Sequence, residues 1–153
     1  MGRQQGGKRA AKAARSLGEE AVIAVLRVAN RLNLDVATLL KPHALTLSQY
    51  NALRTMRGAG DGGVTCGQLG ERMLTHDPDI TRLIDRLERA GWAARERSST
   101  DRRVVSTHIT SAGIALLAGL DAEVAAFDRR VFAALDDKRL AQLVASLQAV
   151  LAG

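Results

Sequence analysis

The chain has 153 residues, of which 46% are hydrophobic and 25% are charged. This is the size of one domain, with enough apolar residues to bury a core. Only 3% of the residues are aromatic, and Ala, Leu and Val supply most of the apolar mass, which favours helices. A single cysteine, Cys66, excludes an intramolecular disulfide. No apolar run is typical of a signal peptide or a membrane span, so we expect a soluble, cytoplasmic protein.

The net charge is +6, which favours a polyanionic partner, first nucleic acid and then an anionic membrane surface. Five of the 22 basic residues lie within residues 1–15, where no acidic residue occurs. The remaining 17 basic residues face 16 acidic ones. Most of the excess positive charge therefore lies in a basic N-terminal segment, and net charge alone is weak evidence for DNA binding.

The N-terminal third predicts a disordered tail followed by a long helix. Residues 1–9 are rich in Gly, Gln and basic side chains, which is typical of disorder. From Ala10 to Leu40, apolar residues recur at alternating spacings of three and four. This stripe, at 22–39, needs a partner to cover it. Lys41-Pro42 ends the helix, because the residue before proline avoids the helical region.

Two capping boxes predict the next two helices. In Thr46–Gln49 and Thr65–Gln68, a Thr hydroxyl and a Gln side chain each satisfy the backbone amide of the other residue. We expect a helix from the first box to Met56, a loop at 58–63, and a short helix from the second box to about Met73.

After a turn, Asp77 is predicted to cap a further helix with Pro78 at its first position, and Gly91 ends it. Its apolar residues follow helical spacing: Ile80, Leu83, Ile84 and Leu87. Residues 65–90 therefore form a predicted helix-turn-helix, whose second helix has one apolar and one charged face.

Residues 92–97 and 102–109 are the best strand candidates, with 98–101 as the hairpin loop. Two strands do not form an independent sheet, so this hairpin must lean on the helical core as a wing.

Two more helices are predicted, one capped by Thr110 and running to about Leu135, the other capped by Asp136. The first carries another heptad-like stripe, at 117–134. Both heptad-like stripes fit packing within one chain or between two copies of it. The predicted fold is mainly α, with long terminal helices and one two-stranded wing.

In a helix-turn-helix the second helix enters the major groove of DNA. Arg82 and Arg86 lie one turn apart, and the planar fork of arginine suits guanine or phosphate. Asp79 is either an acceptor for cytosine N4 or a charge that favours the helix N-terminus.

The wing suggests contact with a narrow minor groove, which attracts arginine. Arg95, Arg97, Arg102 and Arg103 are placed at its tip, around Ser99 and Thr100. Asp101 is a hypothetical buttress for one of these arginines, and Asp101→Ala is expected to weaken DNA binding although it removes a negative charge.

Residues 46–119 resemble the multiple-antibiotic-resistance regulator (MarR) family. The matching segments are LTLSQYNALRTM and TRLIDRLERAGWAARERSSTDRRVVSTHITSAG. The wing signature of the family, Asp-x-Arg, falls on Asp101 and Arg103. Its T-R-L-x-D-R-L-E sequence falls on Thr81 to Glu88.

The resemblance implies a homodimer joined by the terminal helices, which reads a pseudo-palindromic operator as a transcription regulator, with repression as the expected mode. It also implies a small aromatic or anionic effector that releases the protein from DNA. The expected organisation is a disordered tail (1–9), a helical dimerisation region (10–45 and 110–153) and a winged helix-turn-helix (46–109).

The residues expected to contact DNA lie on both helices of the motif, the turn and the wing: Thr65, Gln68, His76, Asp77, Asp79, Thr81, Arg82, Asp85, Arg86, Arg97, Ser99, Thr100, Asp101, Arg102 and Arg103. His43 and Tyr50 are the candidates for an effector pocket.

No catalytic, metal or cofactor signature stands out. The three histidines show no ligand spacing, and no catalytic array, P-loop or dinucleotide fingerprint occurs, so an enzyme is not expected. Cys66 starts a helix, and we interpret it as a packed or capping residue. The alternatives to a sequence-specific regulator are a winged-helix protein-interaction module and a sequence-neutral architectural DNA binder.

Overall fold

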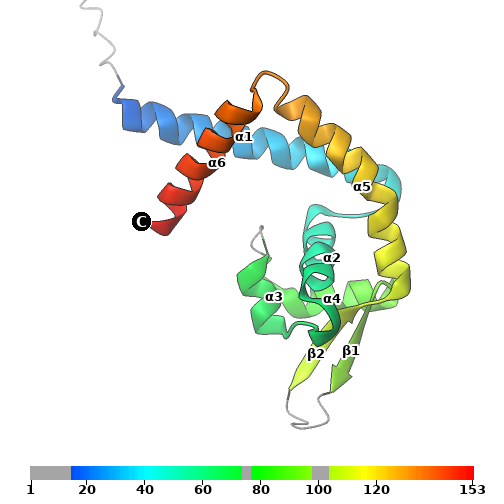
Figure 1. Ribbon diagram of the computed structural model, residues 1–153. Helices are drawn as coiled ribbons and strands as arrows, with labels where there is room; N and C mark the ends of the chain where they lie inside the picture. Colours follow the sequence, from blue (N-terminus) through cyan, green and yellow to red (C-terminus); the bar gives the residue numbers. More distant parts are fainter. Residues whose placement is uncertain (1–14, 74–76, 98–103) are drawn as a thin grey trace, which may run out of the picture.

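The computed structural model describes residues 15–73, 77–97 and 104–153, which form a mainly helical fold with one two-stranded antiparallel sheet (Figure 1). This confirms the predicted fold class. The elements in chain order are α1 Leu17–Leu40, η1 Lys41–His43, α2 Leu47–Ala59, η2 Gly60–Gly62, α3 Cys66–Arg72, α4 Ile80–Arg89, β1 Ala93–Arg97, β2 Val105–Ile109, α5 Ser111–Val131 and α6 Asp137–Ala152.

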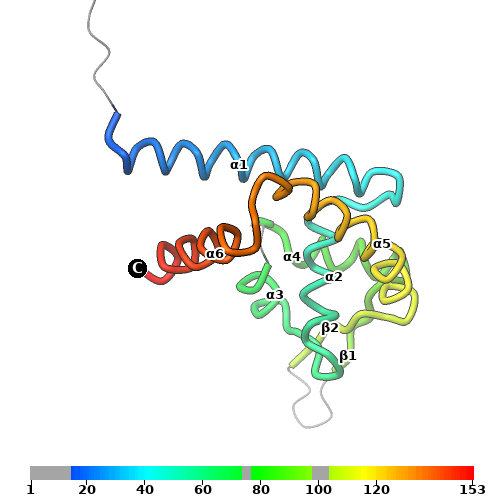
Figure 2. Tube along the Cα trace, turned by 45° about the horizontal axis from the view of Figure 1, so that its top comes forward, coloured from blue at the N-terminus to red at the C-terminus, as the bar shows by residue number. Residues whose placement is uncertain are grey.

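The elements divide into a lobe and an arm. Helices α2, α3 and α4 and the hairpin form the lobe, while α1, α5 and α6 form the arm beside it (Figures 1 and 2). The lobe has a continuous core in which Leu53, Met56, Leu69 and Leu87 are fully buried. Leu117 on α5 joins this core, so the arm begins as an extension of the lobe.

Both predicted capping boxes are present. Thr46 Oγ1 accepts from the Gln49 amide at 3.2 Å, and Gln49 Oε1 accepts from the Thr46 amide at 2.9 Å. Thr65 and Gln68 repeat the exchange at 3.3 and 3.0 Å. Each box satisfies two amides that a helix start leaves without partners.

The predicted cap of α4 was wrong by two residues. Asp79 is the N-cap, and its Oδ1 accepts from the Arg82 amide at 3.0 Å. Asp77 Oδ1 instead accepts from the Asp79 amide at 3.0 Å, which forms a turn that holds Pro78 outside the helix. The apolar face that packs on the core starts at Ile80, so the later aspartate is the one in register with it.

Three other helix boundaries differ from expectation. The cap of α1 is Ser16, whereas the predicted start at Ala10 lies outside the described residues. Helix α2 continues past Met56 to Ala59, and α5 ends at Val131 instead of near Leu135. A tight turn, closed by the Leu135 amide on the Phe132 carbonyl at 2.9 Å, reverses the chain into α6.

The hairpin is tied to the rest of the lobe by a backbone bridge that the sequence did not reveal. Val64 exchanges two backbone hydrogen bonds with Thr107 on β2, at 3.0 and 2.7 Å. Gly63 makes this approach possible, because its φ is +60° and an added Cβ would lie 2.5 Å from the His108 ring. The hairpin therefore contacts the rest of the lobe through backbone hydrogen bonds as well as side chains.

The arm leaves much of its apolar surface exposed. On α1, Val22 and Val25 are 59% and 49% exposed, and on α6, Leu147 and Val150 are 38% and 79% exposed. The exposed apolar residues of α1 and α6 therefore lie on surfaces that this chain alone does not cover. Within the described ranges, no helix combines the length and apolar character that a bilayer crossing requires.

Candidate nucleic-acid interface

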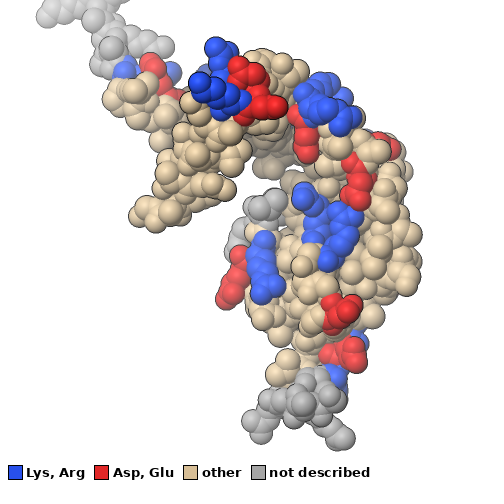
Figure 3. All heavy atoms as spheres, viewed as in Figure 1, with Lys and Arg blue, Asp and Glu red and all other residues tan. Residues whose placement is uncertain are grey.

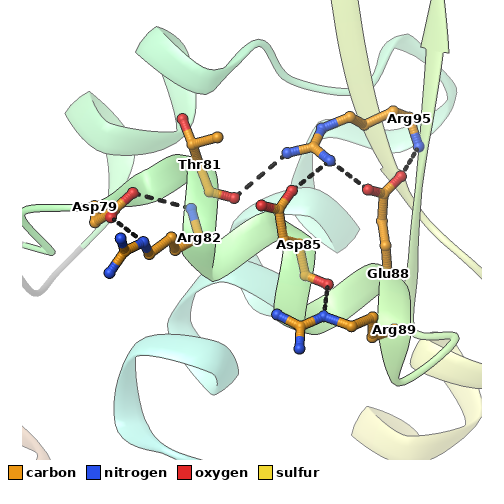
Figure 4. Close-up of polar contacts among 7 residues, drawn as sticks. All are labelled: Asp79, Thr81, Arg82, Asp85, Glu88, Arg89 and Arg95. Carbon is orange, nitrogen blue, oxygen red and sulfur yellow. Dashed lines mark hydrogen bonds and ion pairs between the residues drawn. The ribbon is translucent and has the colours of Figure 1, made fainter.

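The α3–α4 pair forms the predicted helix-turn-helix, and α4 has three distinct faces. Leu83, Ile84 and Leu87 are fully buried in the core. Arg82, Arg86 and Arg89 follow one another at helical spacing along an exposed stripe, called here the arginine stripe. The third face carries Thr81, Asp85 and Glu88 and points toward β1 (Figure 4).

Arg82 begins the arginine stripe and is held by the cap residue. Its Nε lies 3.1 Å from Asp79 Oδ2, while Asp79 Oδ1 caps the helix. One carboxylate therefore both starts α4 and orients the guanidinium (Figure 4). The two terminal nitrogens of Arg82 remain as a fork of donors at the outer surface.

Arg95 does not lie at the wing tip, which corrects the sequence-based placement. It is the central residue of β1, and its Nη1 lies 2.7 Å from Asp85 Oδ1 and also pairs with Glu88 Oε2. Its Nη2 donates to the Thr81 carbonyl at 3.4 Å. Burial lowers the pKa of Arg95, but the hydrogen bond that Arg95 donates to Asp85 and the negative charges of both acids together raise it.

Asp85 also lies off the outward stripe where it was predicted. The single charged face expected from the sequence is in fact two faces, and Asp85 belongs to the one that meets β1. Arg86 and Arg97 are exposed, and neither forms an ion pair with another residue that the structure describes. Both arginines are therefore available to bind an anion.

Thr65 and Gln68 are placed at the start of α3, where their side chains form the capping box. Cys66 follows directly and is exposed, which corrects its interpretation as a packed residue, and the cap itself is Thr65. His76, Ser99, Thr100, Asp101, Arg102 and Arg103 lie outside the described residues, so the Asp101 buttress stays a prediction.

Charges of both signs share the described surface. On the face that Figure 3 shows, Lys and Arg side chains lie beside Asp and Glu on both the arm and the lobe. This agrees with the nearly balanced composition beyond residue 15. Local arrangement of arginines, and not bulk charge, therefore distinguishes the α4 surface.

A model of the MarR family matches residues 44–104 of this chain. A MarR transcription factor from Planctomyces limnophilus is 32% identical over 89% of this chain and 98% of its own, with a TM-score of 0.66. The chain belongs to the MarR family. The family-model match spans the helix-turn-helix and β1, which are the elements that carry the arginines described above.

Other MarR-type proteins agree in sequence or in fold. The transcriptional regulator MhqR of Bacillus subtilis is 35% identical over 49% of this chain and 50% of its own length. The MepR–DNA complex of S. aureus shares the fold, with a TM-score of 0.73 at 16% identity over 91% of this chain and 98% of that one. The chain spans about half the length of the curated relatives it matches.

In this MarR-family chain a cavity of about 190 Å³ lies between α1, α2 and α5. Tyr50, one of the two predicted pocket residues, lines it, and Arg54 lies over the Tyr50 ring with its guanidinium carbon 5.6 Å from the ring centre. Phe127 and Asp128 line the opposite wall. His43 is not among the lining residues; its Nε2 lies 3.5 Å from Glu123.

An ion pair that the sequence did not reveal joins lobe and arm next to this cavity. Arg57 on α2 donates from Nη1 and Nη2 to the two oxygens of Asp121 on α5, each at 3.0 Å. The hydrogen bond from Arg57 lowers the pKa of Asp121. Because the partners are 64 residues apart, no local pattern predicts them.

Proposed function

We propose that this protein is a dimeric, sequence-specific DNA-binding transcription regulator of the MarR type, which acts in the cytoplasm as a repressor. The observation that carries the proposal is α4, whose apolar face is buried while Arg82, Arg86 and Arg89 stand exposed beside the hairpin. This is the arrangement a recognition helix needs to enter a major groove.

The proposed contacts divide between groove edges and phosphates. Arg82, at the N-terminal turn of α4, reads a guanine with its free fork, while Arg86 and Arg97 bind phosphate or a groove edge. The wing residues Ser99 to Arg103 take the neighbouring minor groove. The MepR structure from S. aureus is that of a complex with DNA, which supports DNA as the partner of this fold.

A second copy of the chain is the proposed cover for the exposed apolar residues of α1 and α6. A dimer places two α4 helices about 34–36 Å apart, one turn of B-DNA, so the operator is a pseudo-palindrome. Closed two-fold symmetry matches the two-fold symmetry of such a site.

An effector site is proposed in the cavity lined by Tyr50, where Arg54 supplies a cation and Phe127 an aromatic wall. These groups suit a small aromatic or anionic molecule. The site adjoins the junction of lobe and arm, so a ligand there can change the spacing of the two recognition helices. Such a ligand releases DNA only if it binds the DNA-incompetent arrangement better.

The test is selection of genomic fragments by the purified full chain, followed by competition with random duplex. We expect a selected site that outcompetes random duplex at least a hundredfold. The double variant Arg82→Ala/Arg86→Ala should lose at least tenfold in affinity for that site.

Two outcomes would favour the other functions. Equal binding to all duplexes would indicate an architectural binder, because phosphate contacts carry no sequence information. No salt-dependent duplex binding at all would indicate a protein-interaction module and overturn the proposal.

A further inference from the structure

Four contacts join Arg95 of β1 to the recognition helix. Besides the three made by its guanidinium with Asp85, Glu88 and the Thr81 carbonyl, the Arg95 amide donates to Glu88 Oε1 at 2.8 Å. The Glu88 carboxylate thus accepts from the backbone and the side chain of one residue (Figure 4). We call the set Arg95, Asp85 and Glu88 the wing clamp.

The wing clamp also closes the outer edge of the hairpin. Thr107, the partner of Arg95 on β2, uses its own amide and carbonyl with Val64, so the Arg95 amide points away from β2. The Arg95 amide donates instead to the Glu88 carboxylate. The outer edge of β1 is therefore joined to α4, while its inner edge pairs with β2.

The wing clamp also affects the charge that α4 presents to DNA. Helix α4 carries three arginines on its exposed stripe and two carboxylates, Asp85 and Glu88, on the adjacent face. A carboxylate left unpaired within a Debye length of a phosphate repels it. Arg95 pairs with both carboxylates and cancels one of their two negative charges, so the arginines of α4 dominate the field that the helix presents to DNA.

We propose that Arg95 is a positioning residue for DNA binding, which holds the wing against the recognition helix and weakens the repulsion between the phosphates and the carboxylates of Asp85 and Glu88. This inference rests on the proposed function. Arg95 does not itself contact DNA, because its side chain is 28% exposed and three acceptors of the lobe occupy its terminal nitrogens. Arg97, two residues along the same strand, is the matched contrast: it is exposed and forms no ion pair within the described residues.

The test compares affinities for the selected operator and for random duplex at several salt concentrations. Arg95→Met keeps the length of the stem and removes the charge, and we expect about a tenfold loss of operator affinity. The triple variant Arg95→Met/Asp85→Asn/Glu88→Gln removes the two carboxylates as well, while an amide oxygen at position 88 can still accept from the backbone amide of residue 95 and hold the strand. We expect this variant to bind within about threefold of the wild type. In variants verified as folded, recovery on neutralising the acids reports their repulsion of phosphate and not a loss of folded protein.

Arg97→Met is the control, because it makes the same substitution on the same strand. It should weaken operator and random duplex alike and reduce the salt slope by about one unit, without recovery when Asp85→Asn/Glu88→Gln is added. Arg95→Met should change the slope by less than about half a unit. Circular dichroism well below the unfolding midpoint verifies that each variant is folded.

The inference is overturned if Arg95→Met binds as tightly as the wild type, or if it behaves like Arg97→Met. The triple variant keeps the test decisive if Arg95→Met does not fold, because it contains no unpaired carboxylate; a tenfold loss in the triple variant would then contradict the inference. A wild-type protein that binds no duplex overturns the proposed function as well, whereas normal wild-type binding with an unaffected Arg95→Met overturns this inference alone.

Discussion

Asp79 uses its two carboxylate oxygens for different purposes at the start of the recognition helix. One caps α4 and the other pairs with Arg82. Because Arg82 is otherwise exposed, this pair is the device that restricts the direction of its guanidinium before DNA arrives. The cap and the ion pair can be separated, since asparagine caps a helix as well as aspartate does.

At this scale we expect Asp79→Asn to keep the stability of the protein but to lower its discrimination between the operator and random duplex. Affinity for random duplex should rise slightly, because a negative charge is removed. Asp79→Ala should also lose the cap and about 1 kcal/mol of unfolding free energy. Competition binding together with denaturant unfolding separates the two effects, and an unchanged discrimination ratio in Asp79→Asn would contradict the orienting role.

Between elements, a backbone bridge within the lobe and an ion pair between lobe and arm add to the packing of the core. The Val64–Thr107 bridge depends on Gly63, which combines a left-handed backbone with close contact to the His108 ring. Gly58, near the end of α2, has helical geometry and no neighbouring atom within 4 Å of an added Cβ. The same substitution at these two positions should therefore have opposite effects.

We expect Gly63→Ala to lower the unfolding free energy by about 2 kcal/mol or more, because it adds backbone strain to a steric overlap. Gly58→Ala should instead raise it by up to about 1 kcal/mol, because alanine loses less entropy in a helix. Urea unfolding measures both, and a Gly63→Ala protein as stable as the wild type would show that the hairpin does not need this approach.

The Arg57–Asp121 pair predicts a pH dependence between lobe and arm. Arg57 lowers the pKa of Asp121 in the folded protein, so the pair contributes stability above the pKa of the unfolded chain. This contribution is lost as the pH falls through the lowered folded-state pKa. The effect is small, because both side chains are partly exposed to solvent.

Asp121→Asn should therefore be less stable than the wild type at neutral pH, and the difference should shrink below about pH 4. Thermal unfolding of both proteins across the acid range checks the sign. A difference that grows toward low pH would mean that another group dominates.

On the scale of the whole molecule, a single chain leaves the apolar surface of the arm largely uncovered. Helix α6 has no buried residue, and α1 buries only Leu40 at its end. Two helices with this much exposed apolar surface are stable only when covered, which a second copy does in the proposed dimer.

We expect Leu143→Glu/Leu147→Glu on α6 to give a monomer by light scattering, with at least a hundredfold loss of operator affinity because one monomer engages one half-site. Gln142→Glu and Gln148→Glu add the same charges at polar positions of the same helix and should leave the dimer intact. A wild-type monomer at micromolar concentration would contradict the dimer.

The basic segment at residues 1–15 is also expected to affect DNA binding by the whole molecule. Deleting residues 1–15 removes five cations, and we expect weaker binding to all duplexes alike and a smaller salt slope. Loss of affinity for the operator alone would show that the basic segment at residues 1–15 contributes to sequence recognition.

The sequence by itself determined the features that are encoded within a few consecutive residues. Capping boxes, helical apolar spacing and the hairpin depend on residues close in sequence, so the order of the α-helices and strands and all three Thr caps could be predicted from the sequence. The TRLIDRLE and DRR segments likewise indicated the MarR family without any knowledge of the fold.

Only the tertiary structure decided which charges remain available. The sequence placed Arg95 with the wing arginines and Asp85 on the outer face, but folding brings β1 against α4, and the opposite charges pair. The same holds for Arg57 with Asp121 and for Val64 with Thr107, whose partners are distant in sequence. Chain reversals create these contacts, and no local pattern encodes the distance between two residues that a fold brings together.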